Sequence, residues 1–273
     1  MSFVSRIIPS ALLVTALLAV GGCASNQNGI AVGGTGAASE TPSAPVAPSS
    51  EAPTPDPVVT PTPTPTPTPE GFDKTKKSID NPASSWVVVN KLRPLDPADY
   101  AADDLVSVPV PYQNPPILRK RASDAVVEMF DAFTDETGLE MQSQSAYRSY
   151  SAQVRVYNGW VSSLGKKAAD LTSARPGFSE HQTGLAIDIN AKPTECTLKA
   201  CFGDTKQGKW LAKNAWEYGF ILRYPEDATD ITGYEYEPWH YRFVGLDLAE
   251  EMHDTGTETL EEFFDLPAAP DYK

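Results

Sequence analysis

Basic residues are scarce in this chain of 273 residues. Lysine and arginine number 22 against 36 aspartates and glutamates, which gives a formal net charge of −14. A nucleic-acid-binding surface needs clustered positive charge, and an acidic chain also repels other anionic polymers. The composition therefore excludes nucleic acid as an expected partner.

A hydrophobic run long enough to stay in a bilayer is missing from the N-terminus. The apolar run at residues 11–20 follows a single arginine, Arg6, and has the length of a signal-peptide core. It ends in VGGC, and small residues directly before a cysteine are typical of bacterial lipoprotein signals, in which Cys23 would be lipidated. An ordinary secretory signal with an incidental cysteine is the alternative. We expect a signal peptide over residues 1–22.

Cysteine is also rare, with three in the chain. If Cys23 carries a lipid, Cys196 and Cys201 remain, an even number in an oxidising compartment, and the short loop TECTLKACFG is one that a disulfide could close. Free or metal-binding thiols are the alternative. A thiolate zinc site would need two further ligands, and no CxxC or nearby histidine supplies them. We expect the disulfide.

Residues 24 to about 78 contain almost no large apolar side chains. They include TPTPTPTPTP (Thr60–Pro69), a composition that favours extended polyproline II over a packed core. We therefore assign residues 23–80 to a disordered tether and residues 81–273 to one folded domain without internal repeats. At roughly 3.1 Å per residue, the tether could reach on the order of 100 Å. The expected location is the outer face of the bacterial cytoplasmic membrane, with a lipid anchor and access to the cell wall.

Periodicity in the folded part predicts helices and strands in no regular βαβ order. The predicted strands are Ser84–Leu95 (in part), Leu139–Ser145, Leu185–Asn190, Phe220–Tyr224 and Tyr234–Val244. Helices are predicted from Ile117 to near Gly138, around Tyr157–Leu164, around Leu211–Tyr218, and near the C-terminus, where Thr259 and Glu262 form a capping box. The mixture predicts an α+β fold with a small antiparallel sheet and flanking helices.

Histidine is as rare as cysteine, yet two of the three histidines have carboxylates at suggestive positions. His181 precedes an alternating strand in which Asp188 points away from the aliphatic side chains. His240 lies in the next motif, EPWH. A mononuclear zinc hydrolase needs about three protein ligands and one open position, and Gly184 lets the chain turn between the first two. The pattern predicts that His181, Asp188 and His240 hold zinc.

A hydrolase also needs a base beside the metal, and Glu237 precedes His240 by three residues. On a regular strand these two side chains would face opposite sides. Pro238 favours a bulge or kink that brings them together. His253 lies near a predicted helix C-terminus, where a cation suits the helix dipole, and is expected to be structural.

Four stretches together resemble one family: SAYRSYSAQ, SARPGFSEHQTGLAIDI, WLAKNAWEYGFILRY and TGYEYEPWHYRFVG. They look like the VanY-type zinc D-alanyl-D-alanine carboxypeptidases, within the LAS group of peptidoglycan metallopeptidases. The resemblance covers residues 85–265, and the combination of SEHxxGxAxD with ExWHxR is highly specific. It implies the same three zinc ligands and Glu237 as the catalytic base.

The resemblance also implies roles for three residues outside the metal site. Arg148 would bind and polarise the substrate near the scissile carbonyl, which suits a planar fork of donors facing a carboxylate or an oxyanion. Gln153 and Ser179 would help to hold the substrate's terminal residue. Trp239 and Tyr147 are candidates for the cleft wall.

The stretch SLGK at residues 163–166 matches the SxxK motif of serine-type enzymes that trim the same substrate. Gly165 breaks the helix that this motif needs, and no SDN or KTG partner follows, so we attribute the match to chance.

The predicted function is removal of the C-terminal D-alanine from peptidoglycan stem peptides by a zinc-dependent, monomeric, lipid-anchored enzyme. An L,D-carboxypeptidase or an endopeptidase acting on peptidoglycan is the nearest alternative, because the metal motifs do not define the pocket walls. A non-catalytic cell-wall-binding lipoprotein on the same scaffold is the alternative from another class. Loss of a ligand or of the base would favour it, and none is lost.

Overall fold

The structure is a computed structural model that describes residues 71–273. The predicted signal peptide, Cys23 and most of the predicted tether lie outside the described residues. Within residues 71–273, no helix has both the length and the apolar character that crossing a bilayer requires.

The packed part of the chain begins before the predicted boundary at residue 81. Phe72 stacks on Trp86 with ring centroids 5.4 Å apart and meets the Phe263 ring edge-on at 5.6 Å. The folded domain therefore includes residues 71–80. The polar composition of the preceding tether gave no sign of this aromatic anchor, and the packed part of the chain extends N-terminally beyond residue 81 at least to Phe72.

Two antiparallel sheets form the centre of the fold, which confirms the predicted α+β class. The larger sheet has the order β3-β4-β6-β5, and the smaller pairs β1 with β2. The strands are β1 (Leu105–Ser107), β2 (Ile117–Arg119), β3 (Glu140–Ser145), β4 (Ala186–Lys192), β5 (Phe220–Leu222) and β6 (His240–Phe243).

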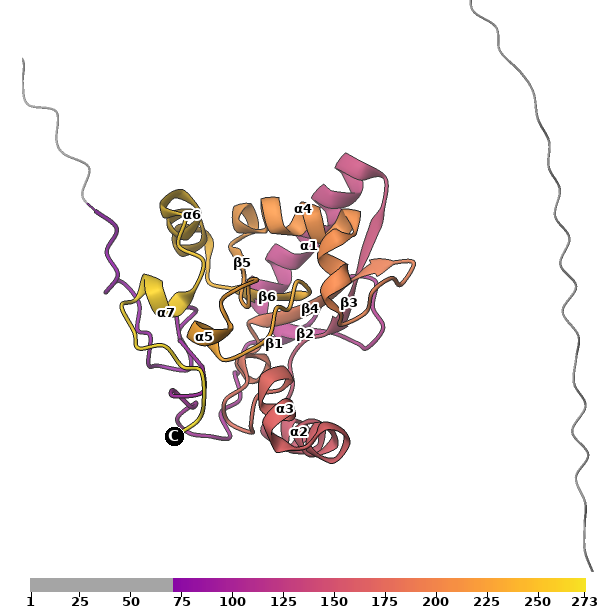
Figure 1. Ribbon diagram of the computed structural model, residues 1–273. Helices are drawn as coiled ribbons and strands as arrows, with labels where there is room; N and C mark the ends of the chain where they lie inside the picture. Colours follow the sequence, from indigo (N-terminus) through magenta and orange to yellow (C-terminus); the bar gives the residue numbers. More distant parts are fainter. Residues whose placement is uncertain (1–70) are drawn as a thin grey trace, which may run out of the picture. The chain divides into compact units, whose positions relative to one another are not determined.

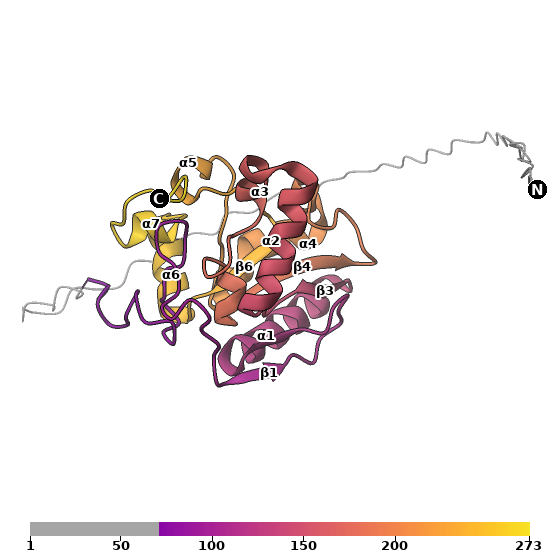
Figure 2. The ribbon, with the colours of Figure 1, turned by 90° about the horizontal axis from the view of Figure 1, so that it is seen from below.

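Helices lie on both sides of the larger sheet. The α-helices are α1 (Lys120–Thr137), α2 (Tyr150–Leu164), α3 (Lys166–Thr172), α4 (Lys206–Asn214), α5 (Thr229–Thr232), α6 (Leu246–Thr255) and α7 (Leu260–Phe263). Three short 3₁₀ helices are η1 (Glu180–Thr183), η2 (Ala200–Asp204) and η3 (Ala215–Tyr218). Figure 1 shows α1 and α4 on one side of the strands and α2 and α3 on the other, and in Figure 2 α2 lies in front of the strands.

The main core fills the space between the sheet and α1. The predicted three- and four-residue spacing places Val126, Met129 and Phe133 on the buried face of α1, against Ile187 and Ile189 of β4. The opposite face of β4 carries Asp188 and is buried as well. One strand therefore separates an apolar core from a buried polar layer, and the functional groups lie in that layer.

Residues 84–95 form no strand, although three consecutive valines predict one. Residues 86–91 are buried, but arginine side chains rather than a neighbouring strand satisfy the carbonyl groups of Val87 and Val88. Arg242 Nη2 donates to Val87 O at 2.8 Å, and Arg93 Nε donates to Val88 O at 3.2 Å. Buried carbonyls need a partner, and side chains from distant sequence can serve instead of a sheet.

The strand predicted over residues 234–244 is also shorter, because only His240–Phe243 pairs with neighbours. Residues 234–239 are irregular. The helix predicted around Leu211–Tyr218 divides into α4 and η3 and ends, as expected, at Gly219.

Candidate metal and substrate site

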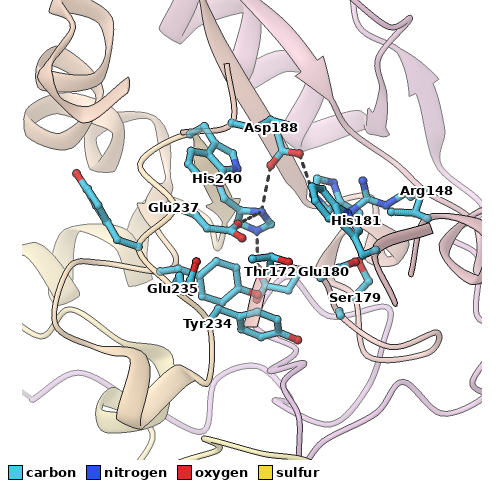
Figure 3. Close-up of a pocket in the computed structure, with 18 of the residues that line it drawn as sticks. Arg148, Thr172, Ser179, Glu180, His181, Asp188, Tyr234, Glu235, Glu237 and His240 are labelled. Carbon is cyan, nitrogen blue, oxygen red and sulfur yellow. Dashed lines mark hydrogen bonds and ion pairs between the residues drawn. The ribbon is translucent and has the colours of Figure 1, made fainter. Parts of the chain in front are cut away.

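Three side chains from separate elements converge in the polar layer of the sheet (Figure 3). His181 comes from η1, Asp188 from β4 and His240 from β6, and one potential ligand atom of each lies within 4.8 Å of the others. Direct pairing of Asp188 with His240 across β4 and β6 fixes two of the three. Gly184, at φ 71°, ends η1, and a Cβ there would lie 2.6 Å from a methyl carbon of Leu105. The predicted glycine turn is therefore required by the local packing.

The His181 ring presents one nitrogen to this cluster. Its Nδ1 lies 2.7 Å from the carbonyl oxygen of Ala146, which can only accept a hydrogen bond, so Nδ1 carries the proton. Nε2 lies 3.3 Å from Asp188 Oδ2. Burial, together with the charge of Arg148, lowers the pKa of His181 and keeps the ring neutral. The Nε2 lone pair is available to a metal.

The two nitrogens of the His240 ring have the opposite roles: Nε2 is protonated, and Nδ1 faces Asp188. Its Nε2 lies 3.2 Å from Glu180 Oε2, and its Nδ1 lies 3.2 Å from Asp188 Oδ1. Burial disfavours its charged form, but the carboxylates of Asp188 and Glu180 outweigh burial and raise the pKa of His240 to about 9. Glu180 keeps a proton on Nε2 whether or not Nδ1 carries one. A bound cation would replace the Nδ1 proton.

The donor set of this cluster fits zinc. Zinc bonds of about 2.0–2.1 Å in tetrahedral geometry place neighbouring ligand atoms about 3.3 Å apart. The contacts of Asp188 with His181 and His240 measure 3.3 Å and 3.2 Å. Asp188 Oδ1 is buried and has no well-oriented hydrogen-bond donor among the described residues, although His240 Nδ1 lies 3.2 Å away, which suits an oxygen that ligates a cation.

Glu237 lies beside the cluster, with Oε2 at 3.8 Å from His240 Nδ1. A turn, rather than a bulged strand, brings the two side chains to the same side: the His240 N–H donates to Glu237 O at 3.0 Å, and the Glu237 N–H donates to Tyr224 O at 3.0 Å. Burial raises the pKa of Glu237 to about 8, because the nearby positive charges of His240 and Arg148 offset only part of the desolvation. A carboxylate with such a pKa can take up and release a proton near neutral pH.

Arg148 is half-buried beside His181, and its own backbone N–H donates to His181 O at 3.1 Å. Its Nε donates to Gln153 Oε1 at 2.7 Å, and its Nη1 donates to Ser145 Oγ at 3.2 Å. Gln153 is fully buried, and its amide nitrogen donates to Ala174 O at 2.6 Å. The structure thus places Gln153 behind Arg148 and not in the cavity wall, where a direct substrate contact would need it.

A cavity of about 390 Å³ opens over the cluster. Its inner part is lined by Arg148, Ser179, His181, Asp188, Tyr224, Tyr234, Glu235, Glu237, Trp239 and His240. Ser179 and Trp239 are therefore where the sequence places them, whereas Tyr147 does not line the cavity.

Two outer walls of the cavity are partly apolar. Trp160 of α2 forms one wall, and Leu198 and Lys199 form another. The second wall belongs to the loop closed by the Cys196–Cys201 disulfide, which the structure contains. The loop therefore borders the cavity, and the disulfide fixes part of its wall.

Several residues of the site carry no recognisable signal in the sequence. Tyr224 lies with its ring 4.9 Å from the His240 ring, and Tyr234 packs on Tyr224 at 4.7 Å. Glu180 is the most informative omission: its side chain is fully buried and contacts His240. A charged residue directly between Ser179 and His181 was the only available hint.

Two sequence features lie apart from the site, as expected. His253 stacks on Trp216 with ring centroids 4.0 Å apart, near the C-terminal end of α6. Gly165 ends α2 and separates Ser163 from Lys166.

These features are those of a metal-dependent hydrolase: three candidate metal ligands and a carboxylate with a raised pKa share one cavity. The VanY family profile, D-alanyl-D-alanine carboxypeptidase, matches residues 116–246. A D-alanyl-D-alanine carboxypeptidase of Enterococcus faecalis is 34% identical over 198 residues, which cover 69% of this chain and 68% of that protein.

Solved structures of this family agree with the fold. That of the LD-carboxypeptidase LdcB has a TM-score of 0.62 and 43% identity, and the match covers 67% of this chain and 87% of that one. A variant of the vancomycin-resistance D,D-pentapeptidase VanY in complex with Zn(II) has a TM-score of 0.55 and 32% identity, covering 66% and 98%. The chain belongs to the VanY family of D-alanyl-D-alanine carboxypeptidases, and it is a metallo-carboxypeptidase.

Proposed function

We propose that this protein removes the C-terminal D-alanine from peptidoglycan stem peptides in a zinc-dependent reaction. The observation that carries the proposal is the convergence of two imidazole nitrogens and the Asp188 carboxylate within 4.8 Å, beside Glu237 and Arg148. The family and the substrate named for the Enterococcus faecalis relative support the choice of substrate.

His181, Asp188 and His240 would hold the zinc through Nε2, a carboxylate oxygen and Nδ1. Three protein ligands leave one position open, as in catalytic rather than structural zinc sites. The zinc-bound state of the related VanY supports the choice of metal. When bound, zinc supplies the Lewis acidity that makes water nucleophilic near neutral pH and polarises a peptide carbonyl.

Glu237 is the residue that moves the proton. Its carboxylate accepts a proton from the water as the new C–O bond forms at the scissile carbonyl. In the second step it passes that proton to the amine nitrogen of D-alanine, and the peptide C–N bond breaks. Burial raises the pKa of Glu237 in the metal-free protein, and a bound cation would lower it, so that the carboxylate can accept a proton and then release it.

Arg148 binds and orients the substrate. A guanidinium held at Nε by Gln153 and at Nη1 by Ser145 keeps its remaining N–H groups in a fixed plane. These donors can meet the peptide carboxylate or the oxyanion that develops at the scissile carbonyl. Gln153 acts through Arg148 as a positioning residue, whereas Ser179 is placed to contact the substrate itself.

The proposal is tested by digesting defined muropeptides with the purified protein and following the products by mass. The pentapeptide should lose one alanine, and the tetrapeptide should remain intact. A pentapeptide that stays intact under conditions in which the protein carries zinc would contradict the D,D specificity.

One observation favours an L,D specificity as the second candidate: LdcB, named an LD-carboxypeptidase, is 43% identical over the matched region. Release of alanine from the tetrapeptide in the same experiment would decide for this candidate, and cleavage of a crosslinked dimer would decide for an endopeptidase.

We further propose that the protein is exported and lipid-anchored through Cys23. Two small residues precede this cysteine, and a Pro/Thr-rich stretch separates it from the domain. A fatty-acid probe should label the wild type and fail to label Cys23→Ala. Equal labelling of both would contradict the anchor.

A further inference from the structure

Four buried charges lie on the Nε2 side of His240. Arg223 Nε donates to Glu180 Oε1 at 2.8 Å, and Arg242 Nη1 donates to the same oxygen at 2.9 Å. The other edge of Arg223 donates twice to Glu261, with Nη2 at 2.7 Å from Oε1 and Nη1 at 3.0 Å from Oε2. Asn90 Nδ2 donates to Glu261 Oε1 at 2.9 Å. A continuous chain of hydrogen bonds thus runs from Glu261 through Arg223 and Glu180 to His240.

Stability alone does not explain this cluster. The side chains of Glu180, Arg223, Arg242 and Glu261 are fully buried in their contacts, and removing charges from water is costly even when they are paired. Well-packed apolar residues often stabilise a core equally well. The arrangement calls for a role that apolar side chains cannot perform.

The two arginines fix the direction of the Glu180 carboxylate. Both donate to Oε1, so Oε2 is left for the Nε2 atom of His240 at 3.2 Å. An ionised carboxylate only accepts hydrogen bonds, so it holds a proton on Nε2 and leaves Nδ1 as the nitrogen that can ligate a metal. Only a fixed acceptor at this position selects the nitrogen that the site needs.

The chain of hydrogen bonds begins outside the segment that matches the family profile, although the aligned relatives extend over more of the chain. That segment ends at residue 246, whereas Glu261 belongs to α7 and Asn90 precedes the match. Helix α7 is held by the Thr259 cap and by packing of Leu260 and Phe263 with Trp86. Figures 1 and 2 both show the first described residues, in indigo, beside α6 and α7.

We propose that Glu180 is a positioning residue that prepares His240 to bind metal, and that Glu261 of α7 holds it in place through Arg223. The metal affinity of the site then depends on a helix outside the family-matched segment. This inference rests on the proposed zinc site and adds residues that do not themselves touch metal or substrate.

The variant Glu180→Gln tests the inference because it keeps the shape of the side chain and replaces one accepting carboxylate oxygen by an NH₂ group. If the glutamine oxygen faces the two arginines, its NH₂ group faces Nε2 of His240 and opposes the proton there. If the amide is flipped, its NH₂ group faces two guanidinium groups. Neither orientation satisfies all partners, so Nδ1 of His240 is no longer the favoured lone pair.

The measurement is zinc affinity by competition with a chelator, on full-length protein whose fold and melting temperature are checked separately. We expect Glu180→Gln to bind zinc about 10- to 100-fold more weakly, the usual range for loss of a partner behind a metal ligand. Asp170→Asn is the matched control. It breaks a partly buried ion pair, in which Arg175 Nη2 lies 2.8 Å from Asp170 Oδ2, without touching the cluster. It should lose stability and keep its zinc affinity.

Glu261→Gln is the second variant. If Glu180→Gln does not fold, Glu261→Gln tests the proposal on its own. Glu261 accepts three hydrogen bonds, and a glutamine cannot accept all of them, so Arg223 must shift. We expect a smaller loss of zinc affinity, less than about tenfold. Wild-type affinity in both variants, or a loss no greater than that of Asp170→Asn, overturns the proposal. If the wild type itself binds no zinc, the proposed function fails instead.

Discussion

The two sides of the His240 ring hold the same kind of residue in opposite states. On the Nε2 side, burial would raise the pKa of Glu180, but Arg223 and Arg242 outweigh burial and hold that pKa well below its usual range. On the Nδ1 side, Glu237 borders the cavity, and burial raises its pKa to about 8. The two carboxylates lie 3.2 Å and 3.8 Å from nitrogens of one ring.

This difference shows that the placement of cationic side chains decides whether a buried carboxylate serves as a fixed hydrogen-bond acceptor or as a proton-transfer group. A carboxylate clamped by two guanidinium groups stays ionised and serves as a fixed acceptor. A carboxylate with weaker compensation keeps a pKa at which it can gain and lose a proton. Both residues are glutamates, and the charged side chains around each one determine its role.

Removing the ring between the two carboxylates should have the largest effect. His240→Ala deletes one of three proposed ligands, so the purified protein should fall from about one equivalent of zinc to nearly none, and activity should fall with it. His253→Ala, on α6, is the control and should keep its zinc. Full zinc content in His240→Ala, measured by elemental analysis, would remove His240 from the site.

Replacing Glu237, the carboxylate on the cavity side of His240, should impair catalysis without affecting metal binding. Glu237→Gln keeps the size of the side chain but cannot accept a proton, so turnover should fall by roughly 10²–10⁴ while zinc content is unchanged. Glu235→Gln, in the same cavity, is the control and should stay within about tenfold of wild type. Near-normal turnover in the zinc-loaded Glu237→Gln protein would mean that the base lies elsewhere.

The raised pKa of Glu237 predicts a pH dependence of stability in the metal-free protein. A carboxyl group whose pKa is higher in the folded state contributes stability that is fully present below its ordinary pKa of 4.5 and is lost as the pH rises through about 8. The loss should be on the order of 5 kcal/mol and should be absent from Glu237→Gln. Denaturant unfolding of both proteins between pH 5 and 9, with a chelator present, measures it. Parallel pH profiles would contradict the raised pKa.

The outer wall of the cavity should give the smallest effect. Replacing Cys196 and Cys201 by serine opens a short loop and should lower the free energy of unfolding by about 2 kcal/mol. Because Leu198 and Lys199 then lose their fixed position, KM should rise by less than about tenfold with little change in kcat. A large fall in kcat or in zinc content would show that the loop supports the metal site.

Local patterns in the sequence predict the parts of the fold that depend on neighbouring residues. The alternation of residues 185–190 predicts β4, and the helical spacing after Ile117 predicts α1. The three candidate ligands are predictable because each lies in a short motif that contains residue types known to ligate metals. The segment at residues 84–95 is not predictable in this way, because part of its hydrogen bonding comes from Arg242, which is 155 residues from Val87.

The supporting residues of the site escape prediction for the same physical reason. Glu180 becomes a fixed acceptor only because Arg223 and Arg242, 43 and 62 residues further on, donate to it. Glu180 lies within the SEHxxGxAxD motif, but the motif does not say which partners its carboxylate meets. In the same way, a turn that depends on Tyr224 O brings Glu237 beside His240.

The most direct test measures turnover of one substrate peptide by Glu180→Gln and by Glu237→Gln as the zinc concentration is raised. Glu180→Gln should recover most of the wild-type turnover when zinc is raised to saturation, because only its affinity is impaired. Glu237→Gln should bind zinc normally and stay slow at every concentration. The account is contradicted if saturating zinc restores Glu237→Gln, or if Glu180→Gln remains as slow as Glu237→Gln with its zinc site full.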